Sequence, residues 1–364
     1  MPKWLIDGVL TLVAIYLVQF IFAQLFVSRQ FSPEVFAQPI KALPAYIYLS
    51  WDAGWYRHFY EVYDRYFWPP LYPFTLRLVS LIFNFESNAF EKSAVLTNLC
   101  SHAVIVLGLS YYLQARERTR QIPAWLVAFL LFFYPGHNVF FAAYSESLYL
   151  AVAIMAFVLR QKEKLFWASL VAGLSALVRT MGAFVAAALF AEQVFRCWRD
   201  RKVYWRDLLL ASPGVIIAFG WQGFLYHLGT TVARENGPWA QGLVTSMVPQ
   251  GMNANLWVLN YLAFSTHWVE VVAFWAGVSA LVYCAVKKRY AEMFYIAFFY
   301  FSLAIYLYRP FPWSRLVSVL FPLYILVADL LRERPRLTAV VLLVSVGFCY
   351  FVQIELFQGR MGEP

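Results

Sequence analysis

Long apolar runs separated by short polar segments dominate the amino-acid sequence. The clearest runs cover residues 5–26, 94–113, 208–226 and 337–351, and they approach or reach the ~20 residues that an α-helix needs to cross a bilayer. They are continuous, whereas the strands of a membrane β-barrel alternate apolar and polar residues. Residues 5–26 are also too long for a signal-peptide core and lack a small-residue cleavage site, so we expect a retained first helix.

This pattern predicts an all-α fold, a polytopic transmembrane helical bundle of about eleven spans. Composition agrees, because 62% of the residues are hydrophobic and only 13% are charged, about half the usual charged share of a soluble domain. A single soluble core could not bury so much apolar surface. Since no internal repeat or phosphate-binding loop divides the chain, we expect one integral membrane domain over residues 1–364.

Basic residues exceed acidic ones and gather between the apolar runs. The formal net charge is +9, and Lys and Arg cluster around residues 116–120, 160–164, 196–202, 287–289 and 332–336. Such clusters are typical of cytoplasmic loops and do not indicate a nucleic-acid partner. The four cysteines lack CxxC spacing and predict neither a disulfide framework nor a zinc site.

Placing the basic clusters in the cytoplasm leaves two long outer segments, residues 28–91 and 229–266. Asp52, Glu146 and Gln250 then share the outer compartment. Residues 72–83 are expected to form a juxtamembrane or re-entrant helix on that side. Between Lys164 and Arg196 the chain must go out and return within about thirty residues, so two short helices should meet at residues 179–182.

The first outer segment carries aromatic residues at helical spacing. We predict a helix that lies on the bilayer with this aromatic face down; the face comprises Tyr56, Phe59, Tyr60, Tyr63 and Phe67. Asp52 stands at the N-terminal end of the helix. It either caps the helix or acts as a catalytic carboxylate.

Three further charged residues are candidates for function. Glu146, at the outer start of a span, suits either a helix dipole or a reaction. Arg179 favours a functional anion partner over a buried ion pair, because an arginine at the centre of a span costs roughly 2.5–3.5 kcal/mol. Arg315, at an outer boundary, either snorkels or binds a ligand. The histidines are scattered without ligand spacing and predict single polar contacts.

Taken in order, several of these elements resemble the PIG-V-like mannosyltransferases, multispanning glycosyltransferases of the GT-C fold. The matching elements are Trp51-Asp52 with its aromatic-rich loop, Trp68-Pro69-Pro70-Leu71-Tyr72-Pro73, Tyr144-Ser145-Glu146-Ser147-Leu148-Tyr149, the segment from Gly173 to Thr180, and Ser314-Arg315-Leu316 leading into Phe321-Pro322-Leu323. They cover most of the chain. Trp68-Pro69-Pro70 departs from the Phe-Phe-Pro type sequence of many relatives, and the chain is short for the eukaryotic enzyme of glycolipid-anchor synthesis.

The resemblance implies inverting transfer of a sugar, typically mannose, from a polyprenyl-phosphate donor to a glycan, glycolipid or protein acceptor on the non-cytoplasmic side. Asp52 corresponds to the family's catalytic aspartate and Glu146 to a second acid. Arg179 and Arg315 are candidates to hold the donor phosphate. Further candidate substrate-binding residues are Trp51, Tyr56, His58, Tyr144 and Trp313.

The resemblance also sets expectations for location and cofactor. A bacterial or archaeal protein is expected, multi-pass in the plasma (inner) membrane with the active site facing outward. The sequence does not establish a cofactor, and the candidate is a divalent cation, Mg²⁺ or Mn²⁺.

A lipid or small-anion transporter or flippase with an intramembrane arginine is the competing function. Transporters often carry internal repeats and broken helices that meet at the midplane, whereas the charged candidates here gather in the outer segments. A purely structural membrane subunit is a third interpretation. It offers no ligand to offset the free-energy cost of placing Arg179 in the membrane. The sequence determines neither the donor sugar nor the acceptor.

Overall fold

The computed structural model describes residues 2–30, 56–57, 60, 69–84, 88–116, 122–134, 138–141, 143–236, 268–306 and 317–357. The described part is entirely helical, without strands, and the helices group into two compact units. This agrees with the predicted all-α class. The prediction of one continuous domain stays a prediction, and most of both predicted outer segments lies outside the described residues.

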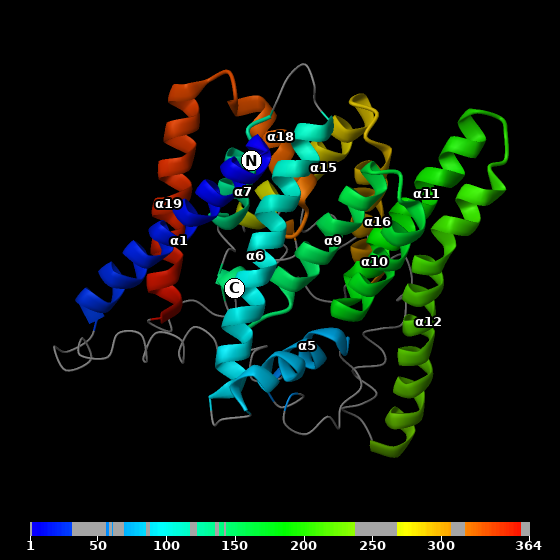
Figure 1. Ribbon diagram of the computed structural model, residues 1–364, viewed down its shortest axis with the longest axis horizontal. Helices are drawn as coiled ribbons and strands as arrows, with labels where there is room; N and C mark the ends of the chain where they lie inside the picture. Colours follow the sequence, from blue (N-terminus) through cyan, green and yellow to red (C-terminus); the bar gives the residue numbers. More distant parts are fainter. Residues whose placement is uncertain are drawn as a thin grey trace. The chain divides into compact units, whose positions relative to one another are not determined.

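The first unit is built around three helices that pack pairwise (Figure 1). They are α1 (Lys3–Gln30), α6 (Ala89–Arg116) and α7 (Ala124–Phe132). The unit also contains α5 (Leu71–Ser80), followed by a 3₁₀ turn (Leu81–Phe83), α8 (Asn138–Phe141), the beginning of α9 (Glu146–Gln161), most of α18 (Phe321–Leu331) and α19 (Pro335–Phe357). The helix predicted at residues 72–83 is therefore present as α5 and its 3₁₀ turn.

The second unit contains the end of α9 and the helices α10 (Leu165–Val178), α11 (Ala183–Arg199), α12 (Trp205–Asn236), α15 (Trp268–Val286) and α16 (Tyr290–Tyr306). Helix α10 packs against α11 and α12, and α16 packs against α11 and α15. Helix α12 continues past Gly229, where the second outer segment was predicted to begin. The first residues of that segment are therefore helical, and its place on the outer side stays a prediction.

Helices α10 and α12 approach so closely that their glycines are required. A Cβ atom on Gly173 would lie 2.9 Å from the Cα of Gly214. The Gly214 N–H donates to Ser169 Oγ (2.8 Å), and Ser169 Oγ donates to the carbonyl of Ala211 (2.6 Å). These bonds cross between the helices beside Pro213, which cannot donate a backbone hydrogen bond. Ser169 therefore stabilises α12 where proline interrupts it.

Among the described residues, two helices are long and apolar enough to cross a membrane, α1 over Lys3–Ile21 and α6 over Ala89–Ala115. Shorter apolar helices cover Leu71–Phe83, Leu165–Val178, Val271–Val286, Phe321–Leu331 and Pro335–Phe351. The apolar runs predicted at residues 5–26, 94–113 and 337–351 thus fold as helices. The count of about eleven spans stays a prediction.

Candidate functional site

Glu146 is the first residue of α9, in the first unit, and it is buried with 1% of its surface exposed. Its neighbours Ser145 and Ser147 are fully buried. The N-terminal end of a helix carries a partial positive charge that favours a carboxylate. The sequence prediction that Glu146 begins a helix is confirmed, and the helix dipole supplies part of the reason for an acid here.

The residue before Glu146 is bonded to Tyr56, which belongs to the segment predicted to lie on the outer side. Tyr56 Oη and Ser145 Oγ lie 2.7 Å apart, and the Tyr56 ring packs edge-on against Tyr72 of α5. Tyr56 is only 2% exposed, so the prediction that its ring faces the bilayer is wrong. The reason is that a phenol hydroxyl in hydrocarbon would lack a hydrogen-bond partner, whereas Ser145 provides one.

Two more contacts hold the same segment against α6. The Tyr60 ring packs edge-on against Phe90, with centroids 5.5 Å apart. Arg57 Nη1 lies 3.4 Å from Glu91 Oε1 in the first turn of α6, in an ion pair that is partly exposed. Partly exposed pairs contribute little stability, but they restrict geometry. Two residues that follow the Tyr56 anchor are thus placed beside the start of α6.

His102 of α6 connects the candidate site to α1 and α8. Its Nε2 lies 2.9 Å from the carbonyl oxygen of Phe140 and 3.0 Å from Ser147 Oγ, and its Nδ1 lies 2.6 Å from Tyr16 Oη. A carbonyl only accepts hydrogen bonds, so Nε2 carries the proton and Nδ1 accepts from the Tyr16 hydroxyl. Ser147 Oγ also donates to the Phe140 carbonyl (2.7 Å). A neutral histidine therefore holds in place the residue that follows Glu146.

Replacing His102 with leucine should destabilise the protein by about 2 kcal/mol, because it removes the buried imidazole's contacts to the Phe140 carbonyl, Ser147 Oγ and the Tyr16 hydroxyl. Tyr16→Phe is the matched control. It removes one of these contacts and should shift the midpoint of thermal unfolding in detergent by clearly less. Equal midpoints for His102→Leu and wild type would show that the network contributes nothing.

In the second unit, Arg179 lies at a break between two short helices, as the sequence predicts. Helix α10 ends at Val178, Arg179 has extended backbone (φ −145°, ψ 142°), and the 3₁₀ turn η2 (Thr180–Gly182) leads into α11. The Gly182 N–H donates to the Arg179 carbonyl (2.7 Å), and Ser175 Oγ lies within 3.0 Å of the Gly182 carbonyl oxygen. The Arg179 side chain is partly exposed.

Gly182 allows this break because its backbone lies against the backbone of Ser175, where a Cβ atom would collide. Gly182→Ala should therefore destabilise the protein by about 2–3 kcal/mol, since backbone atoms cannot move aside as a flexible side chain would. A matched control is Gly220→Ala in α12, where a Cβ atom would meet nothing within 4 Å. Thermal unfolding should show a lower midpoint for Gly182→Ala and an unchanged or slightly higher one for Gly220→Ala.

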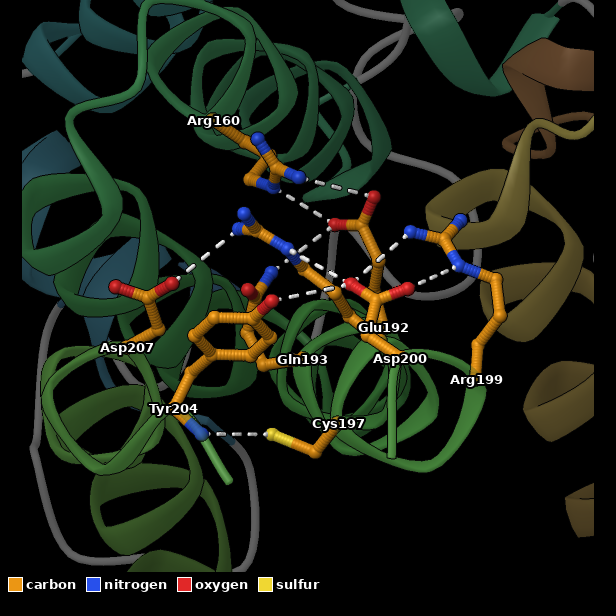
Figure 2. A network of polar contacts seen from close by, with 9 residues as sticks. Arg160, Glu192, Gln193, Cys197, Arg199, Asp200, Tyr204 and Asp207 are labelled. Atoms are coloured by element: carbon orange, nitrogen blue, oxygen red, sulfur yellow. Dashed lines mark hydrogen bonds and ion pairs between the residues drawn. The ribbon is translucent and has the colours of Figure 1, made fainter. Parts of the chain in front are cut away.

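A polar network occupies the end of the second unit where α11 meets α12 (Figure 2). Arg160 at the end of α9 donates to Glu192 of α11 (2.7 and 3.1 Å). Arg196 pairs with Asp207 (3.2 Å), and Arg199 pairs with Asp200 (2.8 Å). The Phe195 ring packs against Tyr290 at the start of α16. The basic clusters at residues 160–164, 196–202 and 287–289 thus lie at one end of the unit, as a shared cytoplasmic side requires.

Tyr56, Tyr144, Glu146 and Arg179 are the predicted site residues that the structure describes. Tyr56 and the buried Tyr144 lie in the same unit as Glu146, and Arg179 belongs to the second unit. The others lie outside the described residues, and so does Gln250; they are Trp51, Asp52, His58, Trp313 and Arg315. Within the described ranges, no three His, Cys, Asp or Glu side chains gather to bind a metal ion. The divalent cation stays a prediction.

Sequence reasoning missed Tyr16, Arg57, Glu91 and His102 as neighbours of the candidate site. Helical spacing offered one signal, since Glu91, Asn98 and His102 recur at intervals of seven and four residues on one face of α6. A polar stripe on an otherwise apolar helix indicates contact with polar groups.

Comparison of the chain with protein-family models, with curated proteins and with solved structures finds no match.

Proposed function

We propose that the protein is a multi-pass membrane glycosyltransferase of GT-C type. It moves a sugar, mannose in the first instance, from a polyprenyl-phosphate donor to an acceptor hydroxyl on the non-cytoplasmic face, with inversion. Asp52 acts as the base, Glu146 supports it, and Arg179 holds the donor phosphate.

Exposed apolar faces support the membrane location. In α1, the exposed side chains include Leu10, Val13, Leu17 and Phe20, which recur every three or four residues on one face. In α19, Val340, Leu343 and Val344 are likewise more than half exposed. Soluble proteins rarely expose continuous apolar patches of this kind, whereas a bilayer covers them.

The contact that carries the catalytic proposal is the hydrogen bond between Tyr56 and Ser145. It fixes the buried Glu146 beside a segment whose Asp52 precedes Tyr56 by four residues. Four residues of chain reach at most about 14 Å. We infer that Asp52 and Glu146 belong to one site, as the resemblance to PIG-V-like enzymes implies.

The proposed chemistry needs a general base, a residue that binds the donor phosphate, and a site on the outer face. The Asp52 carboxylate takes the proton of the acceptor hydroxyl while that oxygen attacks the anomeric carbon. The bond from this carbon to the phosphate oxygen breaks, and the phosphate leaves on its lipid carrier. Arg179 stabilises the leaving phosphate through charge-assisted hydrogen bonds. Glu146 orients the acceptor, or shares a divalent cation with Asp52.

A transfer assay tests this function. Purified protein in lipid is given either polyprenyl-phosphate mannose or a nucleotide sugar, and mass spectrometry follows the gain of one hexose on candidate acceptors. Transfer should occur only from the polyprenyl donor. Transfer from the nucleotide sugar alone would contradict the proposal, as would movement of the lipid donor across the bilayer without transfer.

A further inference from the structure

The turn between α11 and α12 combines exposed tryptophans with an excess of positive charge. Trp198 is 73% exposed and Trp205 is 70% exposed, one on each side of the turn. Residues 196–207 contain five basic and two acidic side chains. We call Trp198, Arg201, Lys202, Trp205 and Arg206 the turn patch.

The acidic residues near the turn patch are occupied by other arginines. Arg199 and Arg196 pair with Asp200 at 2.8 and 3.9 Å, and Arg196 also pairs with Asp207 at 3.2 Å (Figure 2). The hydrogen bond from Arg199 holds the pKa of Asp200 below its usual value, so this pair is ionised at neutral pH. Within the described part of the chain, Arg201, Lys202 and Arg206 have no acidic partner. Their charges are available to an outside anion.

The position of Trp205 indicates which kind of anion this is. Trp205 begins an exposed apolar face of α12 that continues with Leu209, Ile216 and Phe219, each at least 60% exposed. This face requires a hydrocarbon environment, and tryptophan prefers the layer where hydrocarbon meets headgroups. The cations of the turn patch then lie beside lipid phosphates rather than in free solution.

We propose that the turn patch is a binding surface for anionic phospholipid headgroups on the cytoplasmic side. The proposal rests on the membrane location given under the proposed function. Beyond membrane location, the proposal states that the three cations make this turn prefer anionic lipid. The two tryptophans fix the depth of the turn in the headgroup layer. An acidic soluble partner would not explain why the patch continues into an apolar face.

The test uses full-length protein in detergent, titrated with phosphatidylglycerol or phosphatidylcholine and observed by native mass spectrometry. Wild type should bind phosphatidylglycerol more tightly. The triple variant Arg201→Gln, Lys202→Gln, Arg206→Gln should weaken that binding roughly a hundredfold at low salt, at about fivefold for each cation. The control variant Lys288→Gln, Arg334→Gln, Arg336→Gln removes three exposed cations that have no flanking tryptophans. Its affinity should change less than about threefold, because these cations lie outside the turn patch and salt screens their interaction with a headgroup bound there.

Equal losses in the two triple variants would overturn the local site, because they would show a general effect of charge. Equal affinity of wild type for the two lipids would also overturn it, as would binding of a soluble acidic peptide that matches the binding of phosphatidylglycerol. Failure of the membrane location is distinguished separately, since the protein would then be soluble without detergent and would not enter lipid nanodiscs.

Discussion

Asp52→Asn should reduce sugar transfer by about 10²–10⁴-fold, the usual effect of removing a general base. Asparagine is nearly isosteric with aspartate and is an equally good helix cap, so the variant separates the two roles that the sequence leaves open. A capping residue would tolerate the change. A base would not, because the amide cannot accept the proton from the acceptor hydroxyl. The measurement is the rate of hexose transfer from polyprenyl-phosphate mannose at saturating donor.

Asp329→Asn is the matched control for this experiment. Asp329, in the last turn of α18, pairs with Arg332 (3.1 Å), which follows the helix in a basic cluster. The same chemical change there should leave transfer within about twofold of wild type, because Asp329 lies outside the candidate site and asparagine keeps an oxygen that accepts a hydrogen bond. Full activity in a folded Asp52→Asn variant would remove Asp52 from catalysis and leave it with the capping role.

Local pattern was sufficient to predict the helices and the break at Arg179. Apolar runs became α1, α6 and α19, because length and hydrophobicity are properties of neighbouring residues. The break at Arg179 followed from a similar constraint, since a basic cluster on each side left too few residues for two full spans. Gly182 then provides the close backbone contact that this turn needs.

The partners of the candidate site were not predictable in this way. Tyr56 is hydrogen-bonded to Ser145, which is 89 residues away in the sequence, and His102 to Tyr16, which is 86 residues away. Helical periodicity assigns a residue to a face but does not say what that face meets. An aromatic face therefore suggested the bilayer for Tyr56, although a hydroxyl on the same ring required a polar partner. Buried tyrosine and histidine are the residues for which a periodic pattern says least.

Arg179→Lys should raise the KM for the polyprenyl-phosphate donor about tenfold, and Arg179→Ala should raise it about a hundredfold, because hydrogen bonds to charged groups contribute ~1.5–3 kcal/mol. The expectation follows from depth. Helix α10 has 14 residues and is therefore roughly 21 Å long, less than the ~30 Å of the hydrocarbon layer. In the proposed topology, with Lys164 at the cytoplasmic boundary, Arg179 lies within the outer part of that layer, where a phosphate carried on a lipid can reach it. The N-terminus of α11 follows after the short turn η2, and a helix N-terminus also favours the negative charge of a phosphate.

Lysine keeps the charge at residue 179 but loses the planar fork that binds two phosphate oxygens, so the order of the two variants tests the geometry as well as the charge. Arg160→Lys is the matched control. Arg160 also makes a two-bond contact, to Glu192 at the other end of α10 and α11, and its replacement should leave the KM for the donor unchanged. If Arg179→Ala kept the wild-type KM while remaining folded, the phosphate would have to be held elsewhere, and Arg315 would be the next residue to replace.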